Sequence, residues 1–128
     1  MEKYNILIVD DDEFLLDMYT LKFSQAGHTI VAVSGVQDAL TKLEDGYDPD
    51  AVVMDLVMPK MDGFEFLKQL NERNLVPDAA WIVLSNQGEK EDLERARELG
   101  AVGHIVKANA IPSEVLVIVE RMIEKNKK

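Results

Sequence analysis

Charged residues follow three short apolar segments of this sequence. Asp10, Asp11 and Asp12 follow the first segment. Asp55 follows the second, and Lys107 follows the third. If the segments are neighbouring parallel strands, their ends bring several carboxylates and one ammonium to the same edge of a sheet. Closely packed carboxylates repel one another, and a divalent cation with oxygen ligands relieves that repulsion. The sequence therefore predicts a cation site at this edge.

Apolar runs alternate with longer segments of helical period, which favours an α/β fold with a parallel sheet covered on both faces. The expected strands are residues 5–10, 29–33, 50–55, 80–85 and 103–106. The expected helices are residues 13–26, a segment that starts at Ser34 or Gly35 and stops at Gly46, and residues 64–70, 89–99 and 113–124. Right-handed crossovers and short connections then predict a doubly wound five-stranded sheet of order 2-1-3-4-5, with five helices on its two faces.

Length and composition indicate one globular domain, residues 1–128. The net charge of −10, from 24 acidic and 14 basic residues, argues against unaided binding to nucleic acid or to an anionic membrane. The absence of cysteine excludes disulfides, zinc–thiolate sites and thiol catalysis. No apolar run is long enough to span a membrane, and the first residues lack the form of a signal peptide. We expect a cytoplasmic protein whose partners are proteins or small cations.

Four sequence motifs stand in order at the ends of expected strands. They are Val9-Asp10-Asp11, the segment 54–63 (MDLVMPKMDG), Val83-Leu84-Ser85 and Val106-Lys107. Together they make essentially the whole chain resemble the receiver domain of two-component response regulators, of the single-domain chemotaxis type. The resemblance implies a flavodoxin-like fold and a phosphoacceptor function, with no catalysis beyond the domain's own phosphorylation and dephosphorylation.

The resemblance also implies a role for each residue at the acidic edge. Asp55 is the expected phosphoacceptor, and a histidine kinase or a phosphotransfer protein is the expected donor. Mg²⁺ would be held by Asp10, Asp11, Asp55 and the backbone carbonyl of Val57, since this ion prefers a few carboxylates with water completing its shell. Lys107 would supply further positive charge to the transferring group.

Ser85 and His104 are the expected switch residues. In the family, the hydroxyl at position 85 moves towards the phosphoryl group and the side chain at position 104 turns inward. This changes the surface made by residues 89–99, 103–106 and 113–124, through which the domain would control a downstream protein or an output domain. The same surface is the expected site of a weak dimer, if the chain is not a monomer. The charged helix at 89–99 has a thin apolar stripe and should be loosely held.

The sequence departs from the family pattern at three places. Ala108 replaces the usual proline after Lys107, so we expect a trans peptide bond or an altered loop there. His104 replaces tyrosine or phenylalanine, which predicts weaker or pH-sensitive switching. Val57 cannot orient water by hydrogen bonding, although Gln87 can, so we expect moderate to slow self-dephosphorylation.

Other interpretations remain open at this stage. Asp12 and Asp62 fit helix caps better than ligands. Ser85 also fits a turn residue, and His104 a surface histidine on an edge strand. The first rival function is a receiver-like docking module that is never phosphorylated. A haloacid-dehalogenase-type phosphatase normally needs an acid two residues after its nucleophile, where Val57 stands. A dinucleotide- or flavin-binding domain needs a glycine-rich turn after the first strand, which is absent here.

Overall fold

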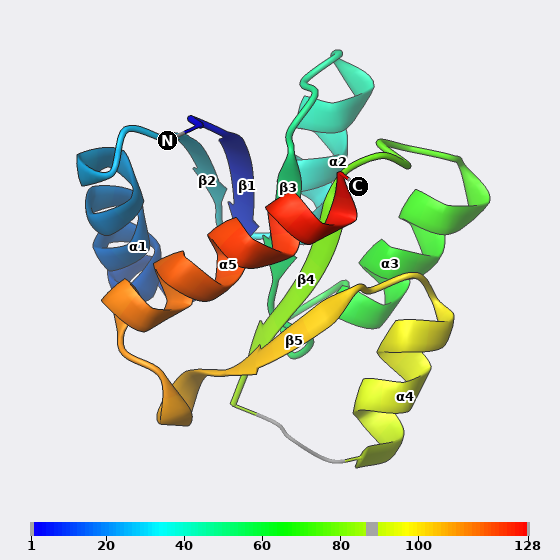
Figure 1. Cartoon of the computed structure of the whole chain (residues 1–128). Coiled ribbons are helices and arrows are strands. Elements are labelled where there is room, and N and C mark those ends of the chain that lie inside the picture. Colours follow the sequence, from blue (N-terminus) through cyan, green and yellow to red (C-terminus); the bar gives the residue numbers. More distant parts are fainter. Residues whose placement is uncertain (1, 87–89, 128) are drawn as a thin grey trace.

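The structure, a computed structural model, describes residues 2–86 and 90–127. Within them, a five-stranded parallel sheet has the order β2-β1-β3-β4-β5, and it forms the middle layer of the molecule (Figure 1). The strands are β1 (Asn5–Val9), β2 (Thr29–Val33), β3 (Ala51–Met54), β4 (Ala80–Ser85) and β5 (Gly103–Val106). The predicted fold class and strand order are confirmed.

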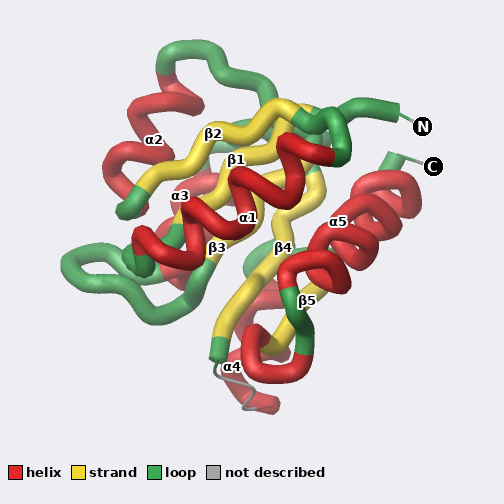
Figure 2. The backbone as a smooth tube through the Cα atoms, turned by 90° about the vertical axis from the view of Figure 1, so that its left-hand side faces the viewer, coloured by secondary structure: helices red, strands yellow, loops and turns green. Residues whose placement is uncertain are grey.

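Five α-helices cover the two faces of the sheet in the described part of the chain (Figure 2). They are α1 (Glu13–Gln25), α2 (Val36–Glu44), α3 (Gly63–Glu72), α4 (Lys90–Glu98) and α5 (Pro112–Asn126). One core cluster joins α1 and α5 to the sheet, and the other joins α2, α3 and α4 to the opposite face. Ile6 and Ile8 enter the first cluster, whereas Leu7 and Val9 enter the second, because successive side chains of a strand point to opposite faces.

Two strands end one residue earlier than predicted, and both differences concern the acidic edge. The first and third strands end at Val9 and Met54, so Asp10 and Asp55 lie just outside the sheet. Each aspartate accepts a hydrogen bond from the backbone N–H two residues later, Asp12 in one case and Val57 in the other. Such short-range bonds compete with the strand ladder and start a turn.

The segment after β5 contains a short helix that the sequence did not predict. Lys107–Asn109 form one turn of 3-10 helix, η1. No cis peptide bond occurs in the described part of the chain, as expected once Ala108 replaces proline. The last α-helix then begins at Pro112, one residue earlier than predicted. Proline suits this first helical position because its missing N–H would have no intrahelical partner there.

The fourth helix contributes little to the core. Ala96 is its one fully buried residue among those described. Polar contacts hold its other side: the Arg95 guanidinium lies 4.2 Å from the centre of the Phe64 ring, and the Asn71 side-chain amide donates to the carbonyl of Leu99 at 3.2 Å. No helix in the described ranges is long and apolar enough to cross a bilayer.

Candidate functional site

The candidate site lies at the carboxyl edge of the sheet. Asp10 follows β1 and Asp55 follows β3, and these strands are direct neighbours, with Val9 paired to Met54. Lys107 is the first residue after β5. The edge therefore brings together three of the residues that the sequence predicts for the site.

Lys107 joins the two buried carboxylates. Its Nζ lies 2.6 Å from Asp10 Oδ2 and 2.8 Å from Asp55 Oδ2. The three side chains are only 8%, 3% and 11% exposed, respectively. The other oxygens are also engaged, since Asp10 Oδ1 accepts from the Asp12 N–H at 2.9 Å and Asp55 Oδ1 accepts from the Val57 N–H at 3.1 Å. The carboxylates are thus fixed in orientation, with Oδ2 of each towards the ammonium.

Burial and charge act in opposite directions on the protonation of this cluster. Burial raises the pKa of Asp10, although its hydrogen bond with Lys107 and the backbone N–H of Asp12 act against that rise. Burial alone would lower the pKa of Lys107, but its hydrogen bonds with Asp10 and Asp55 and their negative charges outweigh burial, so the pKa is raised. Lys107 is therefore a fixed positive charge at neutral pH.

Three carboxylates at this edge are close enough to share one cation. One oxygen from each of Asp10, Asp11 and Asp55 lies within 4.8 Å of the others. Asp11 is exposed, whereas the other two are buried, so the group opens to solvent on one side. An all-oxygen donor set with access to water fits a hard divalent cation such as Mg²⁺, which retains several water ligands. The Val57 side chain is 61% exposed on the following loop.

The two aspartates that were interpreted as helix caps have that role. Asp12 is the N-cap of α1, where its side chain accepts from the Leu15 N–H at 3.2 Å. Asp62 is the N-cap of α3 and accepts from the Glu65 N–H at 3.0 Å. These bonds satisfy backbone donors that the first turn of a helix leaves unpaired.

Ser85 and His104 lie on the same face of the sheet. Ser85 ends β4 and is fully buried. On the neighbouring strand His104 pairs with Val83, two residues before Ser85, so the two side chains are diagonal neighbours. His104 is partly exposed, and its Nε2 atom is buried. Gln87 lies outside the described residues.

Gly63 contributes to the site in a way that the sequence did not indicate. Its N–H donates to the carbonyl of Leu56 at 3.0 Å. A Cβ atom at this position would lie 2.3 Å from the backbone oxygen of Asp55. The missing side chain thus lets the start of α3 pack directly on the Asp55 backbone. A glycine after a cap residue was the only local signal, and it does not reveal a contact with residues so far away in sequence.

Comparison with known proteins identifies the family. A family model described as response regulator receiver domain matches residues 6–119. The chain is a response regulator receiver domain. It is 31% identical over 121 residues to the alkaline phosphatase synthesis transcriptional regulatory protein PhoP of Bacillus subtilis, which is 94% of this chain and 49% of that protein.

Further relatives place the receiver domain in its family. It is 35% identical over 130 residues to a protein-glutamate methylesterase/protein-glutamine glutaminase of Syntrophomonas wolfei, covering 99% of this chain and 36% of that protein. The chain therefore spans about half or less of the length of these curated relatives. The solved structure of chemotaxis protein CheY4 of Vibrio cholerae is similar with a TM-score of 0.86 and 25% identity, over 94% of this chain and 99% of that one. A receiver domain protein of Methanospirillum hungatei shares the fold, with a TM-score of 0.87 and 22% identity over 98% of each chain.

Proposed function

We propose that this receiver domain accepts a phosphoryl group on Asp55, with Mg²⁺ bound beside it, from a histidine kinase or a phosphotransfer protein. The domain then changes its α4–β5–α5 surface to control a downstream protein or an output domain in the cytoplasm. The observation that carries the proposal is the cluster of three carboxylates within 4.8 Å, two of them paired with Lys107. The domain catalyses nothing beyond its own phosphorylation and dephosphorylation.

The geometry supports Asp55 as the nucleophile. The Val57 N–H holds Oδ1, so Oδ2 is the oxygen that faces the reacting group. In the transfer, a P–O bond forms at this oxygen while the P–N bond of a phosphohistidine breaks, and the imidazole of the donor leaves with the bonding electrons. Lys107 exchanges its contact with Oδ2 for a contact with a phosphoryl oxygen. Ser85 donates its hydroxyl to a second phosphoryl oxygen.

The residues fit a magnesium ion by their chemistry. Asp10, Asp11 and Asp55 would hold it through carboxylate oxygens, together with the backbone carbonyl of Val57. When bound, the ion supplies positive charge to the oxygens of the transferring group. Asp10 and Asp11 act only as ligands in this proposal, and the place of Asp55 in the segment 54–63, which resembles the receiver motif, favours Asp55 as the nucleophile.

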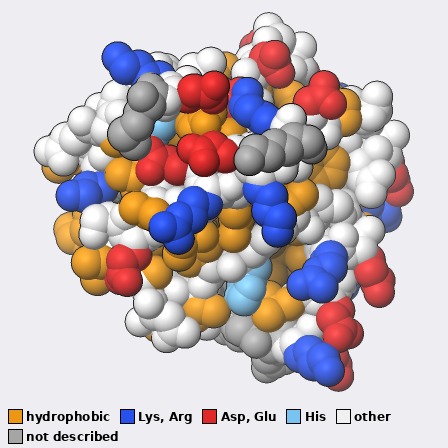
Figure 3. All heavy atoms as spheres, viewed as in Figure 1, with side chains coloured by type: hydrophobic (Ala, Val, Ile, Leu, Met, Phe, Trp, Pro, Cys, Tyr) orange, Lys and Arg blue, Asp and Glu red, His pale blue; other side chains and the backbone are white. Residues whose placement is uncertain are grey.

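An apolar surface beside the site supports a protein as the phosphodonor. The exposed large apolar side chains include Phe14 and Leu21 on α1, and Ile111 and Val117 at and after the start of α5. Figure 3 shows apolar side chains gathered on the side of the molecule where these helices lie. A shallow hollow of about 350 Å³ lies between the two helices. Exposed apolar patches of this kind mark protein contacts.

The proposal is tested by mass spectrometry after incubation with acetyl phosphate and Mg²⁺. The wild-type domain should gain the mass of one phosphoryl group, and Asp55→Asn should gain none because the amide is not a nucleophile for this transfer. Asp62→Asn is the matched control, since Asp62 caps α3 outside the carboxylate cluster. It should be phosphorylated like the wild type.

The same preparations separate phosphorylation from docking without phosphorylation. A phosphoacceptor site should bind beryllofluoride, a phosphoryl mimic, in the presence of Mg²⁺. A wild-type domain that neither gains mass nor binds beryllofluoride would be a docking module instead. Phosphorylation of Asp55→Asn to the wild-type level would assign the nucleophile to another residue.

A further inference from the structure

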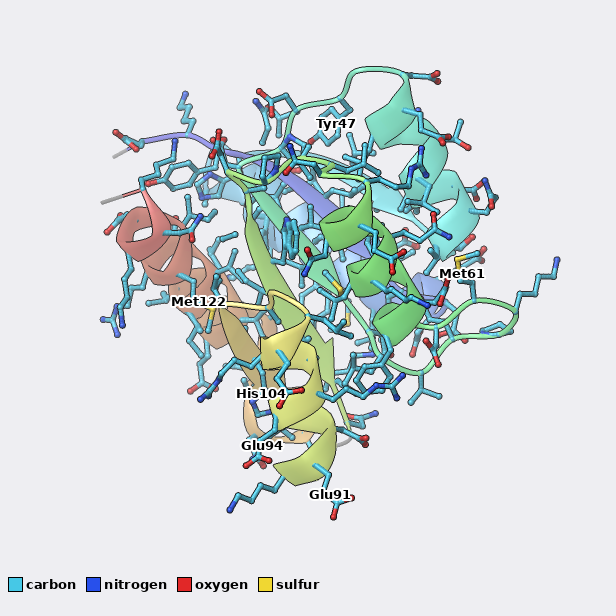
Figure 4. All side chains as sticks on the ribbon, turned by 90° about the vertical axis from the view of Figure 1, so that its right-hand side faces the viewer. Tyr47, Met61, Glu91, Glu94, His104 and Met122 are labelled. Atoms are coloured by element: carbon cyan, nitrogen blue, oxygen red, sulfur yellow. The ribbon has the colours of Figure 1, made fainter. Side chains whose placement is uncertain are left out.

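His104 lies between the edge of the sheet and the fourth helix. Its ring points towards α4 (Figure 4), where a small cavity of about 80 Å³ separates the helix from β5. The helix lines this cavity with Leu93, Ala96 and Arg97, and the following loop adds Ala101. The imidazole therefore acts as a spacer between α4 and the strand.

The surroundings of the His104 imidazole favour its neutral form. Its Nε2 is buried and has no hydrogen-bond partner in the described part of the chain. Protonation would create a buried N–H⁺ without an acceptor among the described residues, beside a cavity that the cationic residue Arg97 also lines. Burying an unpaired charge is costly unless the group moves to water or finds a partner.

Among the residues that the structure describes, the other groups near His104 do not supply that partner. On the sheet side, β4 presents Val83 opposite His104 and Ser85 diagonally from it, and neither carries a charge. On α4, the Glu94 carboxylate lies 4.0 Å from Lys90 and is 59% exposed. Glu94 therefore faces solvent and an existing cation.

The fourth helix, α4, is the element that can move when His104 is protonated. Within the described residues, Ala96 is its one fully buried side chain, so little apolar burial opposes a displacement. Arg95 on the Phe64 ring and Asn71 on the Leu99 carbonyl hold the helix from α3, not from β5. A change at His104 therefore acts on the side of α4 that faces β5, where these two contacts do not hold the helix.

We propose that His104 is an acid-sensitive wedge: its neutral ring supports α4 on β5, and its protonation drives the ring out of the cavity and loosens α4 from the sheet. The acid-loosened helix belongs to the surface that the proposed function assigns to the output, so pH would modulate the response of this receiver. That last step rests on the proposed function, whereas the wedge itself does not.

The direction of the pH effect follows from burial. Burial lowers the pKa of His104 from its ordinary value, which is about 6.5 for histidine. The state with the ring in water therefore binds more protons than the packed state, and falling pH favours the loosened state. With one proton linked, its population rises by at most about tenfold per pH unit below about pH 6.5. Above that pH, the packed state is unaffected.

The test is amide hydrogen exchange of the metal-free, unphosphorylated domain between pH 7.5 and pH 5.5, corrected for intrinsic rates and referred to β3. The amides of α4 should lose protection in the wild type as pH falls, by up to about tenfold per unit. His104→Phe, which keeps an apolar ring in the cavity, should show no such loss. Glu94→Gln is the control and should respond like the wild type.

Three results would overturn the wedge. They are an equal acid response in His104→Phe, no change of α4 in the wild type, and a gain of protection at low pH, which would mean that Glu94 captures the imidazolium. If His104→Phe does not fold, the pH dependence of the His104 ring-proton resonances in the wild type is measured instead. A titration midpoint at or above about 6.5 would contradict the proposal that the neutral ring is the packed form. The assay contains neither phosphodonor nor metal, so failure of Asp55 phosphorylation leaves its result unchanged.

Discussion

Replacing Lys107 by methionine should lower the free energy of unfolding by about 3–5 kcal/mol in metal-free buffer. Lys107 contacts Asp10 and Asp55 at 2.6 and 2.8 Å, and all three side chains are almost fully buried. Methionine fills similar space but leaves two buried carboxylates facing each other without a cation. Removing one partner of a buried ion pair is costly for this reason, even where the intact pair adds little. Urea unfolding with EDTA measures the loss.

Addition of Mg²⁺ should restore most of that stability, and more so in Lys107→Met than in the wild type. The ammonium and a metal ion neutralise the same carboxylates, so the stabilisation that one of them adds is smaller when the other is present. We therefore expect the variant to bind Mg²⁺ more tightly, with a larger metal-dependent shift of the unfolding midpoint.

Two controls make the Lys107 result specific. Lys60→Met removes an exposed lysine from the loop before α3 and should change neither stability nor metal binding by more than a small amount. Asp10→Asn combined with Lys107→Met removes one of the two repelling charges, so it should be more stable in EDTA than Lys107→Met alone. Equal stability of the single and double variants would show that the carboxylates do not repel each other as proposed.

The sequence alone predicts the parts of this fold that depend on local pattern. The strands Thr29–Val33, Ala80–Ser85 and Gly103–Val106 begin and end at the predicted residues. The acidic edge was also predictable, because the order of strands in a doubly wound sheet follows from the strict alternation of elements. Asp10, Asp55 and Lys107 then meet simply because each follows the end of its strand.

The features that the sequence did not predict depend on contacts between distant residues. In α1, Leu16 is buried with Tyr19 and Phe23, whereas Leu15 and Met18 are only partly buried. Nearly every side of this helix carries an apolar residue, so its periodicity does not define one buried face.

The contacts of Lys107 at the acidic edge were also not predictable from the sequence. Nothing local to Lys107 indicates that it bonds to both buried aspartates at once. The cavity under α4, and the burial of the His104 Nε2 without a hydrogen-bond partner among the described residues, arise from how a helix with few apolar residues lies over an edge strand. Packing against a neighbour decides such details, and periodicity reports only which face is apolar.

Replacing Gly63 by alanine should destabilise the domain by about 1–3 kcal/mol and weaken metal binding at the same time. The new Cβ would meet the Asp55 carbonyl oxygen at 2.3 Å and the Leu56 Cα at 2.9 Å. Both obstacles are backbone atoms, so neither a rotamer change nor a small side-chain movement relieves the clash. Either α3 or the backbone that carries Asp55 has to move.

Measurement of both effects in one variant separates a local change at the site from general loss of stability. Gly35→Ala is the control, because a Cβ at Gly35 meets nothing within 4 Å and the residue precedes α2 in an extended conformation. It should cost less than about 1 kcal/mol and leave Mg²⁺ affinity unchanged. If Gly63→Ala loses stability but binds Mg²⁺ like the wild type, α3 moves and the Asp55 backbone does not, so the close approach of the helix serves packing alone. If it loses both, the glycine holds the Asp55 backbone in the position that the proposed metal site requires.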